Sequence, residues 1–242
     1  MSAGGERRLR LLARVLGPSG ELDTRTIAEV CADVTGATGA GIMLMSGDIP
    51  RGPVCATDDV STLIEQLQFS LGEGPCIDAC TLDRPVLEPD LTNPQIARWP
   101  AFSPPALDAG ARAVFGFPLQ VGAARLGALN LYRDRPGGLS DDEHTDALVM
   151  ADITAQALLI LQADAPSGTV AAELDANADF QYVVHQACGM VAAQLGVTVA
   201  QALIRLRGHA FGNNRPLPDV ARDVVARRLR FDADSGEKDP TP

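Results

Sequence analysis

Lysine is almost absent from this sequence of 242 residues: the one lysine, Lys238, lies close to the C-terminal end. A lysine in a chain terminus cannot hold the phosphates of a P-loop, form a Schiff base in a buried site or complete a phospho-receiver domain. The sequence therefore excludes these three kinds of site. Aromatic residues are also few, at 4%, but 46% of the residues are hydrophobic, which is enough for one or two ordinary cores.

Long apolar runs are missing as well. No window approaches the roughly 20 consecutive apolar residues of a membrane-spanning helix. The apolar run from Leu9 to Leu16 is short and is interrupted by Arg10 and Arg14, so it does not have the pattern of a secretory signal. We therefore expect a soluble, cytoplasmic protein with no membrane partner.

Paired cysteines and clustered histidines are also lacking. The five cysteines are Cys31, Cys55, Cys76, Cys80 and Cys188, an odd and scattered set that is typical of reduced thiols. Cys76 and Cys80 would share a face of a helix, so they are either a redox-sensing pair or two buried apolar thiols. The three histidines are far apart, and none has a second ligand three or four residues away, so we expect no metal site.

Charge is distributed unevenly along the chain, whose formal net charge is -11. Residues 1–176 hold 12 arginines against 24 acidic residues, whereas residues 177–231 hold seven arginines against three aspartates. The last eleven residues are again acidic. A small basic module thus follows a large acidic one, which favours a polyanionic partner for the basic part.

The first two thirds of the chain alternate between helical and extended patterns. We predict helices at residues 6–16, 24–34, 60–70, 76–82 and 140–162, and strands at 40–45, 52–56, 85–90, 113–121 and 125–132. Residues 92–110 contain four prolines and no clear periodicity, as in a lid or ligand-binding loop. Ser140 and Glu143 form a capping box for the last helix. The pattern predicts an α+β fold with an antiparallel sheet.

The last third is helical throughout. Apolar stripes predict a first helix over residues 180–195, a second capped by Thr198 and a third with Pro218 in its first turn, which together make a three-helix bundle. We therefore divide the chain into five parts: an N-terminal helix (1–19), an α+β domain (20–162), a linker (163–176), an all-α domain (177–231) and a disordered acidic tail (232–242).

Several motifs in residues 20–162 occur in the order found in GAF domains. They are LGEGPC at residues 71–76, RPV at 84–86 with DL at 90–91, WP at 99–100, VFGFPL at 114–119 and LGALNLY at 126–132. This part of the chain resembles a GAF sensor domain. The resemblance implies an antiparallel sheet with flanking helices and a pocket for a small molecule.

The basic module resembles an ANTAR domain, the RNA-binding output module of transcription antitermination regulators. The matching motifs are Ala187-x-Gly189-Met190, Ala202-x3-Leu206-Arg207-x2-Ala210 and Arg215-x-Leu217-x2-Val220-Ala221, one in each helix or at its start. Two positions depart from the family pattern, which usually has lysine where this chain has Cys188 and often has a second basic residue where it has Gly208. These departures remove two possible phosphate contacts.

The second resemblance implies that arginines of the helical module contact RNA hairpins. The candidates are Arg205, Arg207, Arg215, Arg222, Arg227 and Arg228. Gln201, Arg205 and His209 lie on one face of the second helix. Asp219 with Arg222 and Asp223 with Arg227 are possible local ion pairs, which leaves Arg207 and Arg215 as the first choices for RNA contact.

The first resemblance implies a ligand pocket between the sheet and the overlying loops. Cys76, Trp99, Phe102, Phe115 and Phe117 are the candidate lining residues. The alternative is that these aromatic residues belong to the ordinary core. No cofactor is expected beyond an unknown small molecule in this domain.

Together the two resemblances imply a cytoplasmic regulator in which a small-molecule or redox signal at the GAF domain controls ANTAR helices that bind hairpins in leader transcripts. No catalytic residue is expected. Long apolar stripes at residues 140–162 and 180–195 favour a homodimer formed through a helical bundle.

Two other functions remain open. Some GAF domains are free methionine sulfoxide reductases, and Gly74-Pro75-Cys76 is similar to their thiol region, but no cysteine occurs between Cys80 and Cys188 to supply their reactive thiol. The helical module is also compatible with a DNA-binding helix-turn-helix, although its second helix has few polar base-reading residues in its first turn.

Overall fold

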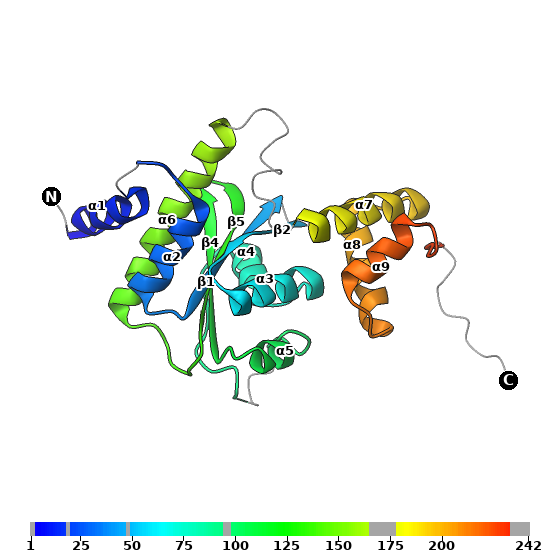
Figure 1. The fold of residues 1–242 in the computed structure, drawn as a ribbon, viewed down its shortest axis with the longest axis horizontal. Helices are drawn as coiled ribbons and strands as arrows, with labels where there is room; N and C mark the ends of the chain where they lie inside the picture. The colour runs from blue at the N-terminus through cyan, green and yellow to red at the C-terminus, as the bar shows by residue number, and fades with distance from the viewer. Residues whose placement is uncertain (1–2, 18–19, 47–48, 94–97, 165–177, 233–242) are drawn as a thin grey trace. The chain divides into compact units, whose positions relative to one another are not determined.

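The computed structural model describes residues 3–17, 20–46, 49–93, 98–164 and 178–232. The chain forms two compact units, Met1–Ala176 and Asn177–Pro242, and each is described by itself (Figure 1). Most of the predicted linker and of the predicted acidic tail lies outside the described residues.

The first unit is built on a five-stranded antiparallel sheet with the order β2-β1-β5-β4-β3. The strands are β1 (Gly39–Ser46), β2 (Ile49–Ala56), β3 (Val86–Glu88), β4 (Ala113–Val121) and β5 (Ala124–Arg133). β2 contains Pro50 and Pro53 and lies at an edge, where a residue without a backbone N–H is tolerated. The α+β architecture expected from the sequence is confirmed.

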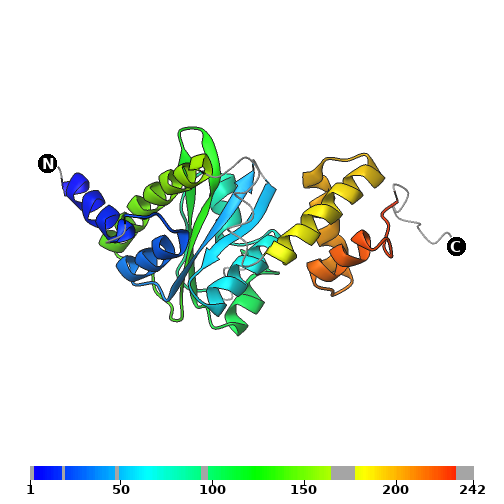
Figure 2. The same ribbon diagram turned by 45° about the horizontal axis from the view of Figure 1, so that its top comes forward.

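Two helices, α2 (Thr24–Thr35) and α6 (Asp141–Asp164), cover one face of the sheet, and α1 (Ala3–Leu16) packs against these two helices from outside (Figures 1 and 2). Alternate residues of the central strands point toward them and form the larger core, among them Ile42, Phe115 and Leu131. α6 is the described helix that is long and apolar enough to cross a membrane, and its buried side packs into this core through Met150 and Ile153.

Three shorter helices cover the opposite face: α3 (Asp59–Leu71), α4 (Pro75–Leu82) and α5 (Ser103–Asp108). The sequence pattern predicts no regular structure at residues 92–110, and for α5 this prediction is wrong. Pro104 and Pro105 lie in the first turn of α5, where the missing backbone N–H has no partner in the helix in any case, so these prolines are compatible with a helix start.

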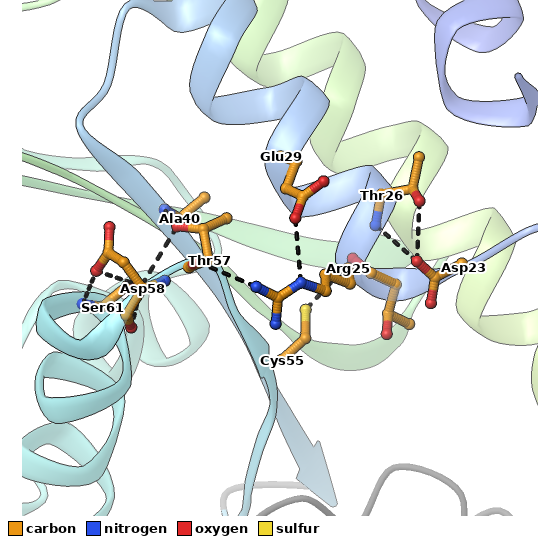
Figure 3. Close-up of polar contacts among 10 residues, drawn as sticks. Asp23, Arg25, Thr26, Glu29, Ala40, Cys55, Thr57, Asp58 and Ser61 are labelled. Atoms are coloured by element: carbon orange, nitrogen blue, oxygen red, sulfur yellow. Dashed lines mark hydrogen bonds and ion pairs between the residues drawn. The ribbon is translucent and has the colours of Figure 1, made fainter.

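Side-chain caps fix the start of α2 and α3 (Figure 3). Asp23 accepts a hydrogen bond from the Thr26 N–H at 2.8 Å, and Asp58 accepts one from the Ser61 N–H at 2.7 Å. The neighbouring Thr57 hydroxyl accepts a hydrogen bond from the Ala40 N–H at 2.9 Å. The N-terminus of α3 is therefore tied to the beginning of β1, which places the buried side of α3 over the sheet.

The second unit consists of α7 (Ala178–Leu195), α8 (Val199–Gly212) and α9 (Leu217–Val225). Their core contains Val184 and Val191 from α7, Leu203 and Leu206 from α8, and Val220 from α9. The predicted Thr198 cap is confirmed: the hydroxyl accepts from the Gln201 N–H, and the Gln201 side chain accepts from the Thr198 N–H. The predicted three-helix arrangement is confirmed as well.

Candidate functional sites

Most of the arginines that were expected to face RNA from α9 and its flanks are engaged in ion pairs. Asp223 pairs with Arg215 at 2.6 Å and with Arg228 at 2.7 Å, and Arg222 pairs with Asp219. Hydrogen bonds from Arg215 and Arg228 lower the pKa of Asp223. The predictions that Arg215 lacks a local partner and that Asp223 pairs with Arg227 were wrong. Arg227 is exposed and follows α9 with a φ of 59°, while the chain bend brings Arg228 back to Asp223.

Arg207 is half-buried rather than exposed on the outer face of α8. Burial lowers the pKa of its guanidinium to about 10, with the nearby Cys188 acting in the opposite direction. The same burial raises the pKa of the Cys188 thiol to about 11, and the positive charge of Arg207 offsets part of that rise. Arg207 is thus positively charged at neutral pH and lies against α7, so it offers less surface to a partner than the sequence suggested.

The outer face of α8 combines positive charge with exposed apolar groups. Ile204 is 65% exposed and Phe211 is 71% exposed, and at Gly208, which lies between them, a side-chain carbon would meet no other atom within 4 Å. Arg205 is exposed on the flank of this face, one turn before Gly208, and has no ion pair within the described part of the chain. Because α8 contains no acidic residue, this surface is cationic as well as apolar.

Sequence reasoning missed Ile204 and Phe211. Both lie outside the buried stripe of α8 and seven residues apart, so their helical spacing was the available signal. Of the three polar residues expected on one face, Gln201 and Arg205 are exposed, whereas His209 is partly covered by Phe231, whose ring centroid lies 5.4 Å away.

The five residues expected to line one ligand pocket lie on two faces of the sheet. Phe115 and Phe117 pack in the core beneath α2 and α6. Cys76, Trp99 and Phe102 lie on the opposite face, under α3 to α5. Side chains alternate along β4, so Phe115 and Phe117 cannot point to the face of Val114. The prediction of a single pocket lined by all five is corrected accordingly.

Trp99 and Phe102 are fully packed. Their rings meet edge to face with centroids 5.8 Å apart, and the Trp99 indole donates a hydrogen bond to Asp78 at 3.1 Å. The Glu73 carboxylate accepts hydrogen bonds from the backbone N–H groups of Ala101 and Phe102. These contacts join the segment before α5 to the turn between α3 and α4, so the two aromatic rings serve as a structural anchor.

A buried polar cluster, which the sequence pattern did not indicate, lies on the α3 side of the sheet. Glu65 and Gln68 of α3 and Asn130 of β5 have no exposed surface. Among the described residues, five of their polar atoms make no hydrogen bond of good geometry: both Glu65 carboxyl oxygens, Gln68 Nε2, and Asn130 Nδ2 and Oδ1. The Asn130 amide still interacts with the Glu65 carboxyl group, and the Gln68 amide with the Cys76 thiol. Gln68 Oε1 accepts a hydrogen bond from the Cys76 N–H at 2.8 Å. Burial raises the pKa of Glu65 to about 8, and the adjacent Asn130 amide offsets part of the rise.

Two glycines make room for this cluster. Gly41 of β1 and Gly116 of β4 are both paired with Asn130 in the sheet, so the three residues form a row across the central strands. A side-chain carbon at Gly41 would lie 2.7 Å from Glu65 Oε1, and one at Gly116 would lie 2.3 Å from the Pro75 carbonyl oxygen. The Glu65 carboxyl group and the start of α4 therefore occupy the space that ordinary side chains would fill.

This fold matches a known family. The family model described as the GAF domain matches residues 22–159, more than half of the chain. The chain belongs to the GAF domain family. The model described as the ANTAR domain matches residues 172–225. The three-helix unit is accordingly the ANTAR domain of a GAF and ANTAR domain-containing protein, as the sequence motifs predicted.

Solved structures share the GAF fold at low sequence identity. The GAF domain of an Acinetobacter phosphoenolpyruvate-protein phosphotransferase is 13% identical, with a TM-score of 0.50 over 69% of this chain and 99% of its own. A type II free methionine-R-sulfoxide reductase from Thermoplasma acidophilum is 14% identical, with a TM-score of 0.40 over 66% of this chain and 96% of its own. At 13% identity, the similarity to the Acinetobacter domain shows a shared fold and nothing more. No curated protein matches the sequence.

The Cys76 and Cys80 thiols of the GAF domain are buried. Burial raises the pKa of the Cys76 thiol well above its ordinary value, and it raises the pKa of Cys80 to about 12. Cys80 also donates a hydrogen bond to the Gly127 carbonyl at 3.1 Å. Because the thiolate is the reactive form, neither group is activated for thiol chemistry in this structure. Within the described residues, no group of three or more His, Cys, Asp or Glu side chains could hold a metal ion.

Proposed function

We propose that this chain, whose combination of a GAF domain with an ANTAR domain is that of a regulator, binds RNA hairpins in leader transcripts in the cytoplasm. It promotes transcription antitermination when its GAF domain receives a signal. ANTAR domains are RNA-binding modules, and hairpin loops present unstacked bases together with phosphates.

The outer face of α8 is the observation that supports this proposal most strongly. Exposed bases stack on aromatic rings, and Phe211 offers such a ring with 71% of its surface exposed. Arg205 supplies positive charge on the flank of this face, one turn before Gly208. Gly208 carries no side chain, so a phosphate or ribose can approach the helix backbone closely. A mixed aromatic and cationic surface without carboxylates suits a single-stranded RNA loop.

The arginines around α9 would act differently. Arg215, Arg222 and Arg228 already pair with aspartates, so a phosphate group has to compete with those carboxylates. Exposed ion pairs of this kind contribute little to stability, so replacing the aspartate by a phosphate costs little free energy. In the proposal these arginines, together with Arg207 and Arg227, contact phosphates and supply affinity that does not depend on RNA sequence. Arg205 and Phe211 contact the bases of the hairpin loop.

A homodimer is part of the proposal. Leu148 and Leu159 of α6 are both partly exposed and lie eleven residues apart, which places them on one side of the helix. Exposed leucines at this spacing suit a helix pair between two copies of the chain. A single species with the mass of one chain at micromolar concentration, with and without RNA, would contradict the dimer.

Crosslinking to cellular RNA tests the proposed function. The full chain is expressed, crosslinked by ultraviolet light and recovered, and the attached RNA is sequenced. We expect hairpins from the leaders of a few transcripts, with recovery reduced at least tenfold by the double change Arg205→Ala with Phe211→Ala. The matched control is Tyr182→Ala with Arg230→Ala, because Tyr182 is also 71% exposed but lies on α7. Equal recovery from wild type and both double variants would refute the role of α8.

A further inference from the structure

The segment that follows α9 turns back toward the rest of the ANTAR domain. Residues 227–232 make up this segment, which we call the C-terminal strap. Its first residue, Arg227, has a φ of 59°. The next two N–H groups, those of Arg228 and Leu229, donate to the Asp223 carbonyl oxygen at 2.8 and 3.1 Å. These contacts fix the direction in which the chain leaves α9.

The end of the strap contacts both α7 and α8. The Phe231 N–H donates a hydrogen bond to the Gln194 side chain of α7 at 2.9 Å. The Phe231 ring meets the His209 ring of α8 edge to face, with centroids 5.4 Å apart. Arg205 lies four residues before His209 on the same flank of α8, which is about 6 Å along the helix axis. The strap therefore brings the residues that follow it to the flank of α8 that carries Arg205.

The residues at the C-terminal end are acidic and carry no large apolar group. The last eleven residues contain one lysine and four acidic residues, which are Asp232, Asp234, Glu237 and Asp239. Residues 233–242 lie outside the described part of the chain, and their sequence contains no Val, Leu, Ile, Met or aromatic residue. Such a segment can bind a surface through its charge, but it has little apolar area to bury.

The nearby flank of α8 has the complementary charge. α8 contains no acidic residue, and Arg205 has no ion pair within the residues that the structure describes. By contrast, Arg215, Arg222 and Arg228 already pair with aspartates. An acidic segment that begins beside His209 is therefore close to a positive charge that no described carboxylate neutralises.

The acidic segment is long enough to lie along this flank. Ten extended residues span up to about 33 Å, whereas the 14 residues of α8 span about 21 Å. Because the segment is covalently joined to the strap, its carboxylates are held near α8 at an effective concentration of order millimolar. Ionic contacts that are individually weak can then form in a large share of the molecules.

We propose that the acidic segment, residues 232–242, binds the Arg205 flank of α8 and competes there with the phosphates of RNA. The strap positions the segment, and its carboxylates take the place of phosphate groups. An RNA that also makes base contacts displaces the segment, whereas an RNA that binds through phosphates alone is largely excluded. The segment thereby makes RNA binding more selective. The competition rests on the proposed RNA-binding function, but the contact between the segment and α8 is measurable without RNA.

Amide chemical shifts of the 15N-labelled full chain test the contact. The test variant is neutralised by four changes, Asp232→Asn, Asp234→Asn, Glu237→Gln and Asp239→Asn. In about 50 mM NaCl, we expect its amide shifts to differ from those of the wild type mainly at residues 201–209 of α8, apart from the changed segment itself. In about 500 mM NaCl these differences should largely disappear, because salt screens exposed charges. Unchanged α8 shifts at the lower salt concentration would overturn the proposal.

A second variant controls for net charge. It removes four exposed carboxylates of the GAF domain through the changes Glu21→Gln, Asp59→Asn, Asp108→Asn and Asp141→Asn. Its net charge equals that of the test variant, but its acidic segment is intact. We expect its α8 shifts to match those of the wild type. Changes in α8 as large as those of the test variant would show that net charge, and not contact with the segment, is responsible.

Binding of fluorescein-labelled poly(U) tests the competition, since this RNA offers phosphates and unpaired bases without a hairpin. In about 50 mM NaCl, the neutralised variant is expected to bind about 3–10 times more tightly than the wild type, because its α8 flank is no longer partly occupied. The charge control is expected to bind within about twofold of the wild type. Equal affinities of the neutralised variant and the charge control would overturn the competition.

Changes at the strap test whether it positions the segment. Phe231→Ala removes the ring contact with His209 and leaves every charge in place. In this background, neutralising the acidic segment should strengthen poly(U) binding less than twofold. Gln194→Ala removes the hydrogen bond to the Phe231 N–H and should act in the same way, and circular dichroism checks that both variants keep their helices. An undiminished gain in both folded variants would show that the strap has no such role.

The outcomes separate this inference from the proposed function. If crosslinking recovers no RNA from any variant but neutralisation changes the α8 shifts, the RNA-binding function is refuted and the contact remains. If RNA is recovered but neutralisation changes neither the α8 shifts nor poly(U) affinity, the competition is refuted and the regulator remains.

Discussion

The Arg133 guanidinium donates a hydrogen bond to the Glu143 carboxylate at 2.8 Å and thereby joins the end of β5 to the first turn of α6. Arg133 is buried, and it also donates to the carbonyl oxygens of Thr35 and Gly138. One side chain thus connects the C-terminus of α2, the loop after β5 and the start of α6. These are the elements that close the larger core of the GAF domain.

Loss of Arg133 should destabilise the GAF domain strongly. Arg133→Ala removes the buried positive charge that pairs with the Glu143 carboxylate and leaves two carbonyl groups without their hydrogen-bond donor. We therefore expect the free energy of unfolding to fall by about 3–5 kcal/mol. Urea unfolding followed by Trp99 fluorescence measures the change. The control is Arg25→Ala, whose ion pair with Glu29 is exposed and should contribute below about 1 kcal/mol. Similar effects of the two variants would contradict the assigned role.

Low pH should weaken the ion pair between Arg133 and Glu143. Burial acts to raise the pKa of Glu143, but hydrogen bonds from Ser140 and Arg133 outweigh it and hold the pKa below the ordinary value of 4.5. A carboxyl group with a lowered pKa stabilises the fold above its unfolded pKa, and this contribution disappears as the pH falls through the folded value. In Glu143→Gln, the Tm should therefore decrease less than in the wild type as the pH falls from about 5 to about 3. An unchanged pH profile would show that other carboxylates dominate acid unfolding.

Glu65 should give the opposite dependence on pH. Its pKa is raised to about 8, so the folded GAF domain binds a proton that the unfolded chain releases above about pH 4.5. Stability from this group should fall as the pH rises from about 5 to 8 and should change little above 8. In Glu65→Gln this part of the decline, of order 3 kcal/mol, should disappear. Parallel stability curves for the two proteins over this range would contradict a protonated Glu65.

The glycine row under the polar cluster should not tolerate a side chain. Gly116→Ala places a carbon about 2.3 Å from the Pro75 carbonyl oxygen, which belongs to the backbone and cannot rotate away. We expect a loss of at least about 2 kcal/mol, measured by urea unfolding. Gly138→Ala serves as the control because nothing lies within 4 Å of the added carbon. A neutral Gly116→Ala would show that α4 is not fixed over the sheet.

Gly208 in the ANTAR domain should separate stability from RNA binding. It lies in the middle of α8 with open space around it, so Gly208→Ala should stabilise the helix by up to about 1 kcal/mol, as Gly189→Ala should in α7. If RNA approaches the backbone at Gly208, the same change should weaken RNA recovery severalfold. Hydrogen exchange of the α8 amides measures the first effect and crosslinking the second. If Gly208→Ala increased both the stability of α8 and the recovery of RNA, the RNA would not approach the backbone at Gly208.

Local patterns were sufficient to predict most of the fold. The hairpin of β4 and β5, the Ser140 capping box and the Thr198 cap depend on residues close together in sequence, and all three are present. α5 was missed because prolines were taken as evidence against a helix, although both lie in its first turn. The face of Phe115 and Phe117 could have been assigned from the alternation along β4, since Gly116 lies between them.

The sites depended on contacts between distant residues. The polar cluster exists because strand register places Gly41, Asn130 and Gly116 in one row beneath α3, and no local spacing encodes that register. Likewise, Asp223 meets Arg215 and Arg228 only after the chain bends at both ends of α9. Residue types showed which kinds of interaction the chain can make. The partner of each charged side chain could be identified only from the three-dimensional structure.

Mapping the protein residues that crosslink to RNA tests the central claim most directly. The wild-type chain is crosslinked to cellular RNA with ultraviolet light, digested with nuclease and protease, and analysed by mass spectrometry for peptides that carry nucleotides. The proposed function predicts nucleotide adducts in the peptide that contains Gly208 and Phe211, and none in peptides of the GAF domain. Adducts confined to the GAF domain, or none at all under conditions that crosslink a known RNA-binding protein, would contradict it.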